Sequence, residues 1–330
     1  MYDIVTFGSA TRDLFLKSKD FKTIKNEKFI TGQGLCFNLG SKIYLDDLFF
    51  ATGGGGTNTA ATFANQGLKT AYVGRVGDDP GGKAILEELD KLKVKRFVSI
   101  DKEIKTAYSV ILSVSKKERT ILVYNGACHY LGTKDIPFNQ LKSKWFYIAG
   151  LSGESKETLL PIINFAKDNK IKVALNPGAA QLALGLNGLK NILATVDILL
   201  LNQEEGAKLA GLPFGKEKKI FKKLDKYIKG IVVMTKGPRG VVVSDGKYIY
   251  SAGIFREKRY VDRTGAGDAF GSAFVAGLIR YKKIEEAITL GSANGTAAVE
   301  ELGAKNGLLT RRRYEREARW KKFRIIKNRL

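Results

Sequence analysis

Residues 261–278, V-D-R-T-G-A-G-D-A-F-G-S-A-F-V-A-G-L, decide how this chain folds. The stretch opens with polar residues and a Gly-Ala-Gly turn, then continues as a helical pattern too apolar for a surface. Thr264 and Gly265 mark the start of the helix, so the amides of Gly265, Ala266 and Gly267 lack partners within it. A buried helix start with free amides favours an anion.

Asp268 lies in the first turn of this predicted helix. A carboxylate at such a position can simply stabilise the helix dipole. It can also act as a general base beside amides that neutralise a developing negative charge. The second interpretation predicts phosphoryl transfer to a hydroxyl group.

Length and composition restrict the class of protein. The 330 residues suffice for one large α/β domain or two ordinary ones, and 44% hydrophobic residues exclude overall disorder. No apolar run approaches the roughly 20 residues that span a bilayer, and the first residues resemble a strand rather than a signal peptide. Cys36, Cys128 and the single His129 offer no zinc spacing, and no Ser-His-Asp set unless His129 supplies it. We therefore expect a reducing, cytoplasmic setting and no membrane partner.

The net charge of +23 points to a competing class, a nucleic-acid-binding protein, although we favour a solvated basic surface as its explanation. Residues 311–330 hold ten basic residues against two glutamates, a net charge of +8. Trp320, Phe323, Ile326 and Leu330 recur there at three- to four-residue spacing, which predicts a basic amphipathic helix. Such a helix either docks on the body of the protein or binds RNA or an anionic surface.

The first half of the chain alternates between two kinds of pattern. Residues 3–10 form an apolar strand, and Asp13 follows at its carboxyl end, where open α/β sheets place ligand groups. Residues 27–52 and 106–124 alternate with period two and predict four strands, the last two joined by a polar turn at 115–118. These strands form a small separate sheet, one face of which needs cover.

Four consecutive glycines, residues 53–56, allow the backbone to pass close to a ligand. Thr57 or Asn58 can begin the helix that follows. Asn58 is then either an N-cap or an amide that both donates to and accepts from hydroxyl groups.

From residue 145 onward, apolar strands alternate with amphipathic helices, which predicts a parallel sheet covered on both faces. The strands are predicted at residues 145–150, 172–177, 197–202 and 230–237, and the helices near 156–168, 186–195, 204–210 and 217–227. Residues 284–303 predict a further helix that is rich in alanine and glycine. Asn202 and Glu205 follow one strand, where helix starts favour both residue types.

Two separated motifs resemble the signatures of the ribokinase (PfkB) family of carbohydrate and nucleoside kinases. Residues 262–268 resemble D-[TR]-T-G-A-G-D. The other signature, G-G-x-x-x-N-x-A followed by a strand and G-x-x-G-D-D-x-x-G, is matched by Gly53, Gly54, Asn58, Ala60, Gly74, Gly77, Asp78, Asp79 and Gly82. The resemblance covers about residues 1–308. It implies an α/β, three-layer ribokinase-like fold with a mainly parallel central sheet and a β-sheet lid formed by residues 27–52 and 106–124. The kinase domain is then residues 1–310, followed by the basic C-terminal helix 311–330.

The resemblance also implies roles for individual residues. Asp268 removes a proton from the acceptor hydroxyl, and the amides of Gly265, Ala266 and Gly267 stabilise the transferring phosphoryl group. The acceptor is held by Asp13, Gly53, Gly54 and Asn58. The nucleotide is bound by Asn202, Thr235, Gly237, Gly240 and Asn294, the last of these near adenine. Glu205 supports Mg²⁺ through water, and Asp262 and Thr264 lie in the loop where many members bind K⁺, although Arg263 stands where sugar kinases carry a threonine.

The implied function is ATP-dependent transfer of the γ-phosphate to a hydroxyl of a small sugar, by a homodimer that associates through the lid. Sugar and nucleoside kinases share these motifs, and the absence of an aromatic cluster that could stack on a base favours a sugar. A nucleoside kinase of the same family stays open as an alternative. So does a non-catalytic, basic nucleic-acid-binding protein on the same fold, because fold alone does not establish function.

Overall fold

The computed structural model describes residues 1–29, 31–114 and 119–330, so the turn predicted at 115–118 lies outside the described residues. A ten-stranded sheet forms the centre of the described part. The strands from β13 to β7 run parallel, and β14, β15 and β16 add to one end in antiparallel pairs. In spatial order the strands are β16 (Ile325–Arg329), β15 (Tyr248–Ala252), β14 (Val241–Ser244), β13 (Ile231–Thr235), β12 (Ile198–Asn202), β11 (Lys172–Leu175), β10 (Ser143–Ile148), β1 (Tyr2–Phe7), β6 (Thr70–Gly77) and β7 (Lys95–Asp101).

Helices cover both faces of this sheet, which gives the three layers that the sequence predicts. The helices on one face are α1 (Gly55–Asn65), α2 (Pro80–Lys91), α8 (Ala266–Tyr281) and α9 (Ile284–Val299). Those on the other face are α3 (Leu159–Asp168), α4 (Ala179–Leu182), α5 (Gly185–Leu193), α6 (Gln203–Ala210) and α7 (Glu217–Leu224). Strand β12 is buried along its first four residues, as expected of a parallel strand between two helical layers.

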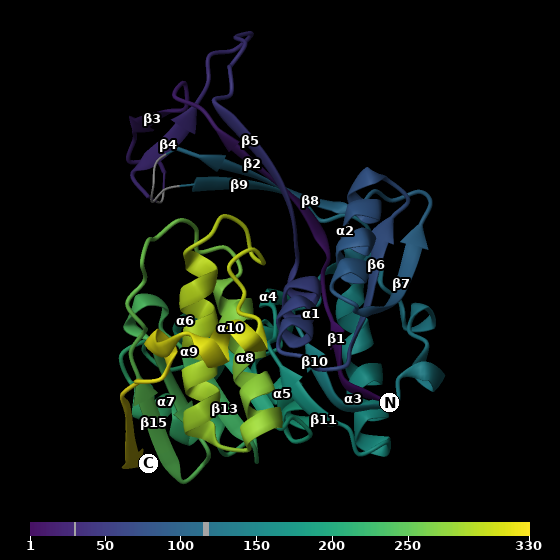
Figure 1. Cartoon of the computed structure of the whole chain (residues 1–330), viewed down its shortest axis with the longest axis vertical. Coiled ribbons are helices and arrows are strands. Elements are labelled where there is room, and N and C mark those ends of the chain that lie inside the picture. The colour runs from purple at the N-terminus through teal and green to yellow at the C-terminus, as the bar shows by residue number, and fades with distance from the viewer. Residues whose placement is uncertain (30, 115–118) are drawn as a thin grey trace.

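Helix α8 is buried over its central residues and packs along α9 (Figure 1). Residues 269–277 are all buried. A Cβ at Gly277 would lie 2.7 Å from the Cα of Ala287, so glycine allows the two helix backbones to approach closely. The polar start of α8 is thereby fixed against the sheet by its apolar continuation.

A four-stranded lid sheet stands apart from the body, at the top of Figure 1. Its strands, in spatial order, are β5 (Asp47–Gly53), β2 (Thr11–Lys17), β8 (Ala107–Ser113) and β9 (Arg119–Tyr124). Beside it, β3 (Lys22–Lys25) pairs with β4 (Gln33–Cys36). The predicted lid strands are found at Asp47–Gly53, Ala107–Ser113 and Arg119–Tyr124, whereas residues 37–46 are not extended.

Residues 11–13 follow the first strand, as the sequence predicts, but they are themselves extended. They begin β2, an inner lid strand, which pairs with β5 on one side and β8 on the other. The chain bends at Gly8, where φ is +148° and a Cβ would lie 2.8 Å from that of Ala149. Asp13 therefore projects from a lid strand.

The prediction of a helix over residues 311–330 is wrong beyond its first turns. Helix α10 (Arg311–Arg316) is followed by a 3₁₀ turn at Ala318–Trp320 and by β16, which pairs with the free edge of β15. The edge of β15 offers backbone hydrogen bonds that local helical spacing does not reveal. The segment does dock on the body, because Trp320 is 1% exposed.

Short 3₁₀ helices complete the described elements. They are η1 (Ala127–Tyr130), η2 (Thr133–Asp135), η3 (Phe138–Gln140), η4 (Gly153–Thr158), η5 (Gly237–Arg239) and η6 (Ala318–Trp320). Across the residues that the structure describes, no helix has both the length and the apolar character needed to cross a membrane.

Candidate active site

Asp268 and Asn58 come together although 210 residues separate them in sequence. The Asn58 Nδ2 atom donates to Asp268 Oδ2 at 2.9 Å. Burial raises the pKa of Asp268 above its usual value, against the opposing effects of this hydrogen bond and the Lys305 charge. Asn58 lies inside α1 and is not its N-cap, and its buried Oδ1 has no partner among the described residues. A half-buried carboxylate beside a free acceptor oxygen suits the abstraction of a proton from a bound hydroxyl group.

The start of α8 presents open amides next to Asp268. Gly265 is the N-cap, with φ at +73°. The amides of Gly265 and Gly267 have no hydrogen-bond acceptor among the described residues, whereas the Ala266 amide donates to the Arg263 carbonyl at 3.2 Å. A Cβ at Gly267 would meet nothing within 4 Å. Two of the three predicted amides are thus unpaired among the described residues and can bind an anion.

The predicted acceptor residues line the junction between the lid and the body. Asp13 is 4% exposed and accepts a hydrogen bond from Thr11 Oγ1 at 2.9 Å, and its burial raises its pKa. A Cβ at Gly53 would overlap Asp13 Oδ2, so only glycine fits beside this carboxylate. Gly54 has φ at +95° and begins the turn into α1, and a Cβ at Gly55 would lie 3.7 Å from Asp268 Oδ1. Asp13, the glycines and Asp268 therefore border one another.

Asn202 and Glu205 form a reciprocal cap at the start of α6. Asn202 Oδ1 accepts from the Glu205 amide at 2.8 Å, and Glu205 Oε2 accepts from the Asn202 amide at 2.7 Å. Burial raises the pKa of Glu205. The second Glu205 oxygen stays available, and no group of three or more metal-ligating side chains occurs within the described ranges. Such a site fits a Mg²⁺ ion that keeps water and phosphate as its main ligands.

The glycine turn after β13 lies next to this cap, because Thr235 pairs with Asn202 in the sheet register. Gly237 and Gly240 have φ of +56° and +88°, and a Cβ at Gly240 would overlap the Ala252 carbonyl. Arg239 Nη2 donates to Gln203 Oε1 at 2.7 Å, in the first turn of α6. The turn and the cap thus place open backbone and positive charge together at the carboxyl ends of two neighbouring strands.

Asn294, which the resemblance places near adenine, is an internal residue. Its side chain is fully buried between helices, where Nδ2 donates to the Ala269 carbonyl and Oδ1 accepts from the Leu309 amide, both at 2.8 Å. Both ends of the amide are used in packing, so this side chain cannot contact a base. The alanine- and glycine-rich pattern permits either base binding or helix packing, and packing is what the structure contains.

Asp262 and Thr264, the candidate K⁺ residues, are bound by a side chain from the lid. Arg119, the first residue of β9, forms an ion pair with Asp262 Oδ1, and its Nη1 donates to Thr264 Oγ1 at 2.6 Å. Asp262 is buried, and its Oδ2 has no partner among the described residues. Sequence reasoning missed Arg119, since nothing in its local pattern shows that it reaches across from the lid.

Sequence reasoning also missed a buried ammonium group in the acceptor region. Lys305 Nζ lies 2.5 Å from Glu88 Oε2 and 2.7 Å from Thr52 Oγ1. Its charge acts on both Asp13 and Asp268. A lysine in a polar loop gives no signal of burial, so only the structure identifies it.

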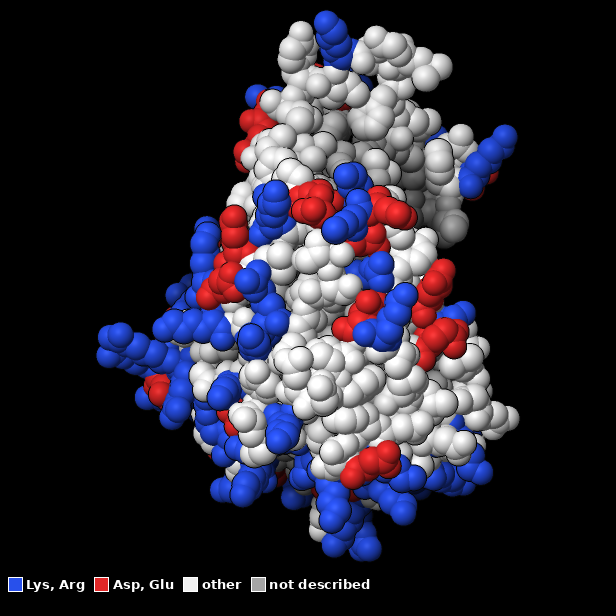
Figure 2. All heavy atoms as spheres, turned by 90° about the vertical axis from the view of Figure 1, so that its right-hand side faces the viewer, with Lys and Arg blue, Asp and Glu red and all other residues white. Residues whose placement is uncertain are grey.

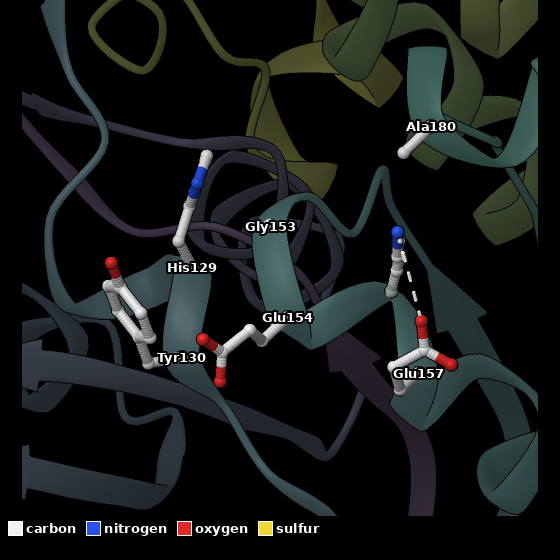
Figure 3. Close-up of a pocket in the computed structure, with 7 residues that line it drawn as sticks. His129, Tyr130, Gly153, Glu154, Glu157 and Ala180 are labelled. Atoms are coloured by element: carbon white, nitrogen blue, oxygen red, sulfur yellow. Dashed lines mark ion pairs between the residues drawn. The ribbon is translucent and has the colours of Figure 1, made fainter.

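The single histidine lines a different cavity, of about 480 Å³, that contains none of the predicted site residues. Figure 3 shows His129 and Tyr130 on one side of it, with Gly153 and Glu154 on the neighbouring η4. His129 Nε2 lies 2.7 Å from Ser152 Oγ, and burial lowers the His129 pKa. Within the described ranges no carboxylate hydrogen-bonds His129, so it does not complete a Ser-His-Asp set.

Comparison with known proteins defines the class. A profile of the pfkB family of carbohydrate kinases matches residues 1–311. The chain is 28% identical over 268 residues to a ribokinase of Haemophilus influenzae, covering 79% of this chain and 85% of that protein. It is 27% identical over 256 residues to a cytidine kinase of Thermococcus kodakarensis, covering 76% and 88%. The structure of Arabidopsis thaliana ribokinase with ribose and ATP superposes with a TM-score of 0.75, at 23% identity and 94% and 96% coverage.

The fold and the family profile together define a phosphotransferase that uses ATP and an alcohol group as acceptor. The chain belongs to the pfkB family of carbohydrate kinases. This confirms the family, the ribokinase-like fold and the class of enzyme that the two sequence motifs predict.

Proposed function

We propose that this protein transfers the γ-phosphate of ATP to a hydroxyl group of a small sugar. The contact between Asp268 and Asn58, beside the open amides of Gly265 and Gly267, is the observation that carries the proposal. It joins a base to an anion-binding helix start, which are the two parts that phosphoryl transfer to an alcohol requires.

In the proposed mechanism, Asp13 and the amide of Asn58 orient the acceptor so that one hydroxyl faces Asp268. Asp268 takes the hydroxyl proton as the oxygen attacks the γ-phosphorus, and the bond from that phosphorus to the β–γ bridging oxygen breaks, which releases ADP. The amides of Gly265 and Gly267 stabilise the charge on the transferring group. When bound, Mg²⁺ neutralises charge on the phosphates. Glu205 and Asn202 would hold it, mostly through water.

K⁺ fits this site poorly. The Arg119 guanidinium already binds Asp262 Oδ1 and Thr264 Oγ1, so a K⁺ ion would have to share these oxygens with a fixed positive charge. We therefore expect similar turnover in K⁺ and Na⁺ buffers.

A nucleoside acceptor is a second candidate that one structural observation favours. Phe15 and Phe49 lie on the lid face that carries Asp13, with ring centroids 6.0 Å apart. Aromatic rings beside a hydroxyl-binding aspartate could contact a base. The resemblance in sequence to a cytidine kinase is compatible with this candidate.

A coupled assay of ADP release, run over pentoses, hexoses, inositols and nucleosides, separates these candidates. We expect the highest kcat/KM with a free sugar, and equal rates in K⁺ and Na⁺ buffers. A nucleoside as the best acceptor would favour the second candidate. No turnover with any acceptor would contradict the proposed function and would support a non-catalytic binding protein.

We further propose that two copies of the chain associate through their lids. Figure 2 shows few charges on the lid end of the molecule, whereas lysines and arginines cover much of the body below. A sheet this small with exposed apolar faces needs cover. The exposed large apolar side chains of the lid region are Phe29, Phe37, Leu39, Tyr44, Leu45, Leu48, Phe50, Ile121, Leu122, Val123 and Tyr124.

Light scattering is expected to give twice the mass of one chain at micromolar concentration. Leu122→Glu places a charge on the lid and is expected to give a monomer, because a buried unpaired charge destabilises an interface. Leu160→Glu is the matched control, since Leu160 is exposed to a similar degree (51% against 55%) but lies on α3, outside the lid. A monomeric wild-type protein, or equal effects of the two substitutions, would contradict the lid interface.

A further inference from the structure

The loop that follows α9 contacts three parts of the active site at once. A Cβ at Gly265 would lie 2.5 Å from Ala304 Cβ, so the loop packs directly against the start of α8. A Cβ at Gly303 would lie 3.4 Å from Ala51 Cβ, on lid strand β5. Lys305 then reaches Glu88 on α2. The loop therefore connects the anion-binding helix start, the lid and the body.

Lys305 is the charged member of this loop, and its side chain is 8% exposed. Its ammonium group donates to Thr52 Oγ1 at 2.7 Å and to Glu88 Oε2 at 2.5 Å, and the Thr52 hydroxyl also donates to Glu88 Oε2. Lysine is rarely buried unless it is paired. Thr52 immediately precedes Gly53, so this contact fixes the strand end from which the acceptor-binding glycines follow.

The same ammonium group is the one cation that acts on both acceptor-side carboxylates in the described structure. The charged groups that act on Lys305 are Glu88 from α2, Asp13 from β2 and Asp268 from α8. Asp13 also experiences Asp262, and Asp268 faces the Tyr147 hydroxyl on β10. Three carboxylates thus act on one buried lysine through their charge, and one of them, on Glu88, also hydrogen-bonds it.

We propose that Lys305 is a positioning residue of the acceptor site, which ties the lid strand β5 to α2 and allows Asp13 and Asp268 to be ionised at the same time. The proposal rests on the proposed kinase function and narrows its substrate class. Because Lys305 is engaged by Glu88 and the other two carboxylates face the acceptor, the site fits a neutral polyhydroxyl compound and disfavours a phosphorylated or carboxylated one.

The pH dependence of kcat/KM distinguishes this role from a purely structural one. Asp268 must be ionised to act as a base, so activity falls as the pH drops through its raised pKa. Lys305→Met removes a positive charge that favours the ionised carboxylate. The acid limb is therefore expected to move to higher pH by about one unit, at the low end of shifts caused by an opposite charge.

Three companion variants sharpen the test. Lys305→Arg keeps the charge and is expected to keep the acid limb near its wild-type position. Lys91→Met is the matched control, because Lys91 is exposed on the rim of the cavity of about 330 Å³ beside Lys305, and no shift is expected. Lys305→Met leaves the Glu88 carboxylate without its partner, and the double variant Lys305→Met/Glu88→Gln removes that carboxylate as well. The double variant should therefore fold even if the single variant does not, and it should still show the shifted acid limb of kcat/KM.

Hydrogen exchange of the ligand-free protein tests the tie without any turnover. Amides of residues 49–54 are expected to exchange faster in Lys305→Met than in the wild type or in Lys91→Met, because the side chain at position 305 no longer binds Thr52.

In the wild type, kcat/KM is expected to be at least about a hundredfold lower for a sugar phosphate than for the free sugar, because like charges repel in the site.

An unshifted acid limb in an active Lys305→Met or double variant would overturn the proposal while leaving the kinase function intact. Unchanged exchange at residues 49–54, or a preference for a sugar phosphate, would also overturn it. Absence of turnover in the wild type would instead contradict the proposed function. Hydrogen exchange alone would then test whether Lys305 holds β5 to α2.

Discussion

Replacing Asp268 by asparagine is expected to lower kcat by about 10²–10⁴-fold, the usual contribution of a positioned general base. Asparagine has the shape of aspartate but cannot accept the proton of the acceptor hydroxyl. The Asn58 amide that donates to Asp268 Oδ2 could still donate to the new side-chain oxygen, so the site should keep its geometry. Steady-state kinetics with the best acceptor measures the effect, and circular dichroism checks the fold.

Asp225→Asn is a suitable control for this experiment. Asp225 is also a half-buried carboxylate whose pKa is raised by burial, and it accepts a hydrogen bond from Ser244 at 2.7 Å, remote from the acceptor residues. Its substitution should leave kcat within a small factor of the wild type. Near-normal turnover of a folded Asp268→Asn protein, or equal losses in both variants, would show that Asp268 is not the base.

Trp320→Ala is expected to destabilise the protein by about 3–5 kcal/mol, as removal of a large buried aromatic side chain does. The indole packs edge-on against Phe255 with ring centroids 5.1 Å apart, and the Arg319 guanidinium lies 3.7 Å from its ring centroid. Arg319 is in turn paired with Glu300, next to the end of α9. Losing the indole therefore leaves a cavity and weakens the contact between the C-terminal segment and the body. Urea unfolding followed by circular dichroism measures the loss.

The same segment provides the control and the rival interpretation. Lys321 and Lys322 are exposed, so Lys321→Gln/Lys322→Gln should leave the unfolding midpoint unchanged. If the segment serves as a nucleic-acid arm, that double variant loses a salt-sensitive affinity for RNA. An unchanged midpoint in Trp320→Ala would contradict the structural role of the segment.

The site residues that the sequence predicts lie in local patterns that indicate their roles. The Gly-Ala-Gly turn before an apolar helix locates Asp268, and the glycine run locates Gly53, Gly54 and Asn58. Both patterns depend on neighbours within a few residues, so they can be read without the fold.

The parts that were missed depend on partners far along the chain. Lys305 gains its role from Glu88, 217 residues earlier, and Arg119 from Asp262, 143 residues later. The family resemblance places Asn294 near adenine, yet tertiary packing takes both ends of its amide. In the C-terminal segment, the three- to four-residue spacing of apolar residues predicts a helix, but residues 325–329 form a strand because they pair with β15.

Strand β16 has a consequence for the order in which the sheet is completed. It covers the outer edge of β15, yet α8, α9 and α10 lie between the two strands in the sequence. During synthesis the edge of β15 stays unpaired while those three helices are made, and an unpaired edge invites strands from other chains. Strand β16 protects the edge of β15 from association only after it has been synthesised and has paired. Slow synthesis of its residues would prolong the exposure of that edge and favour aggregation over folding.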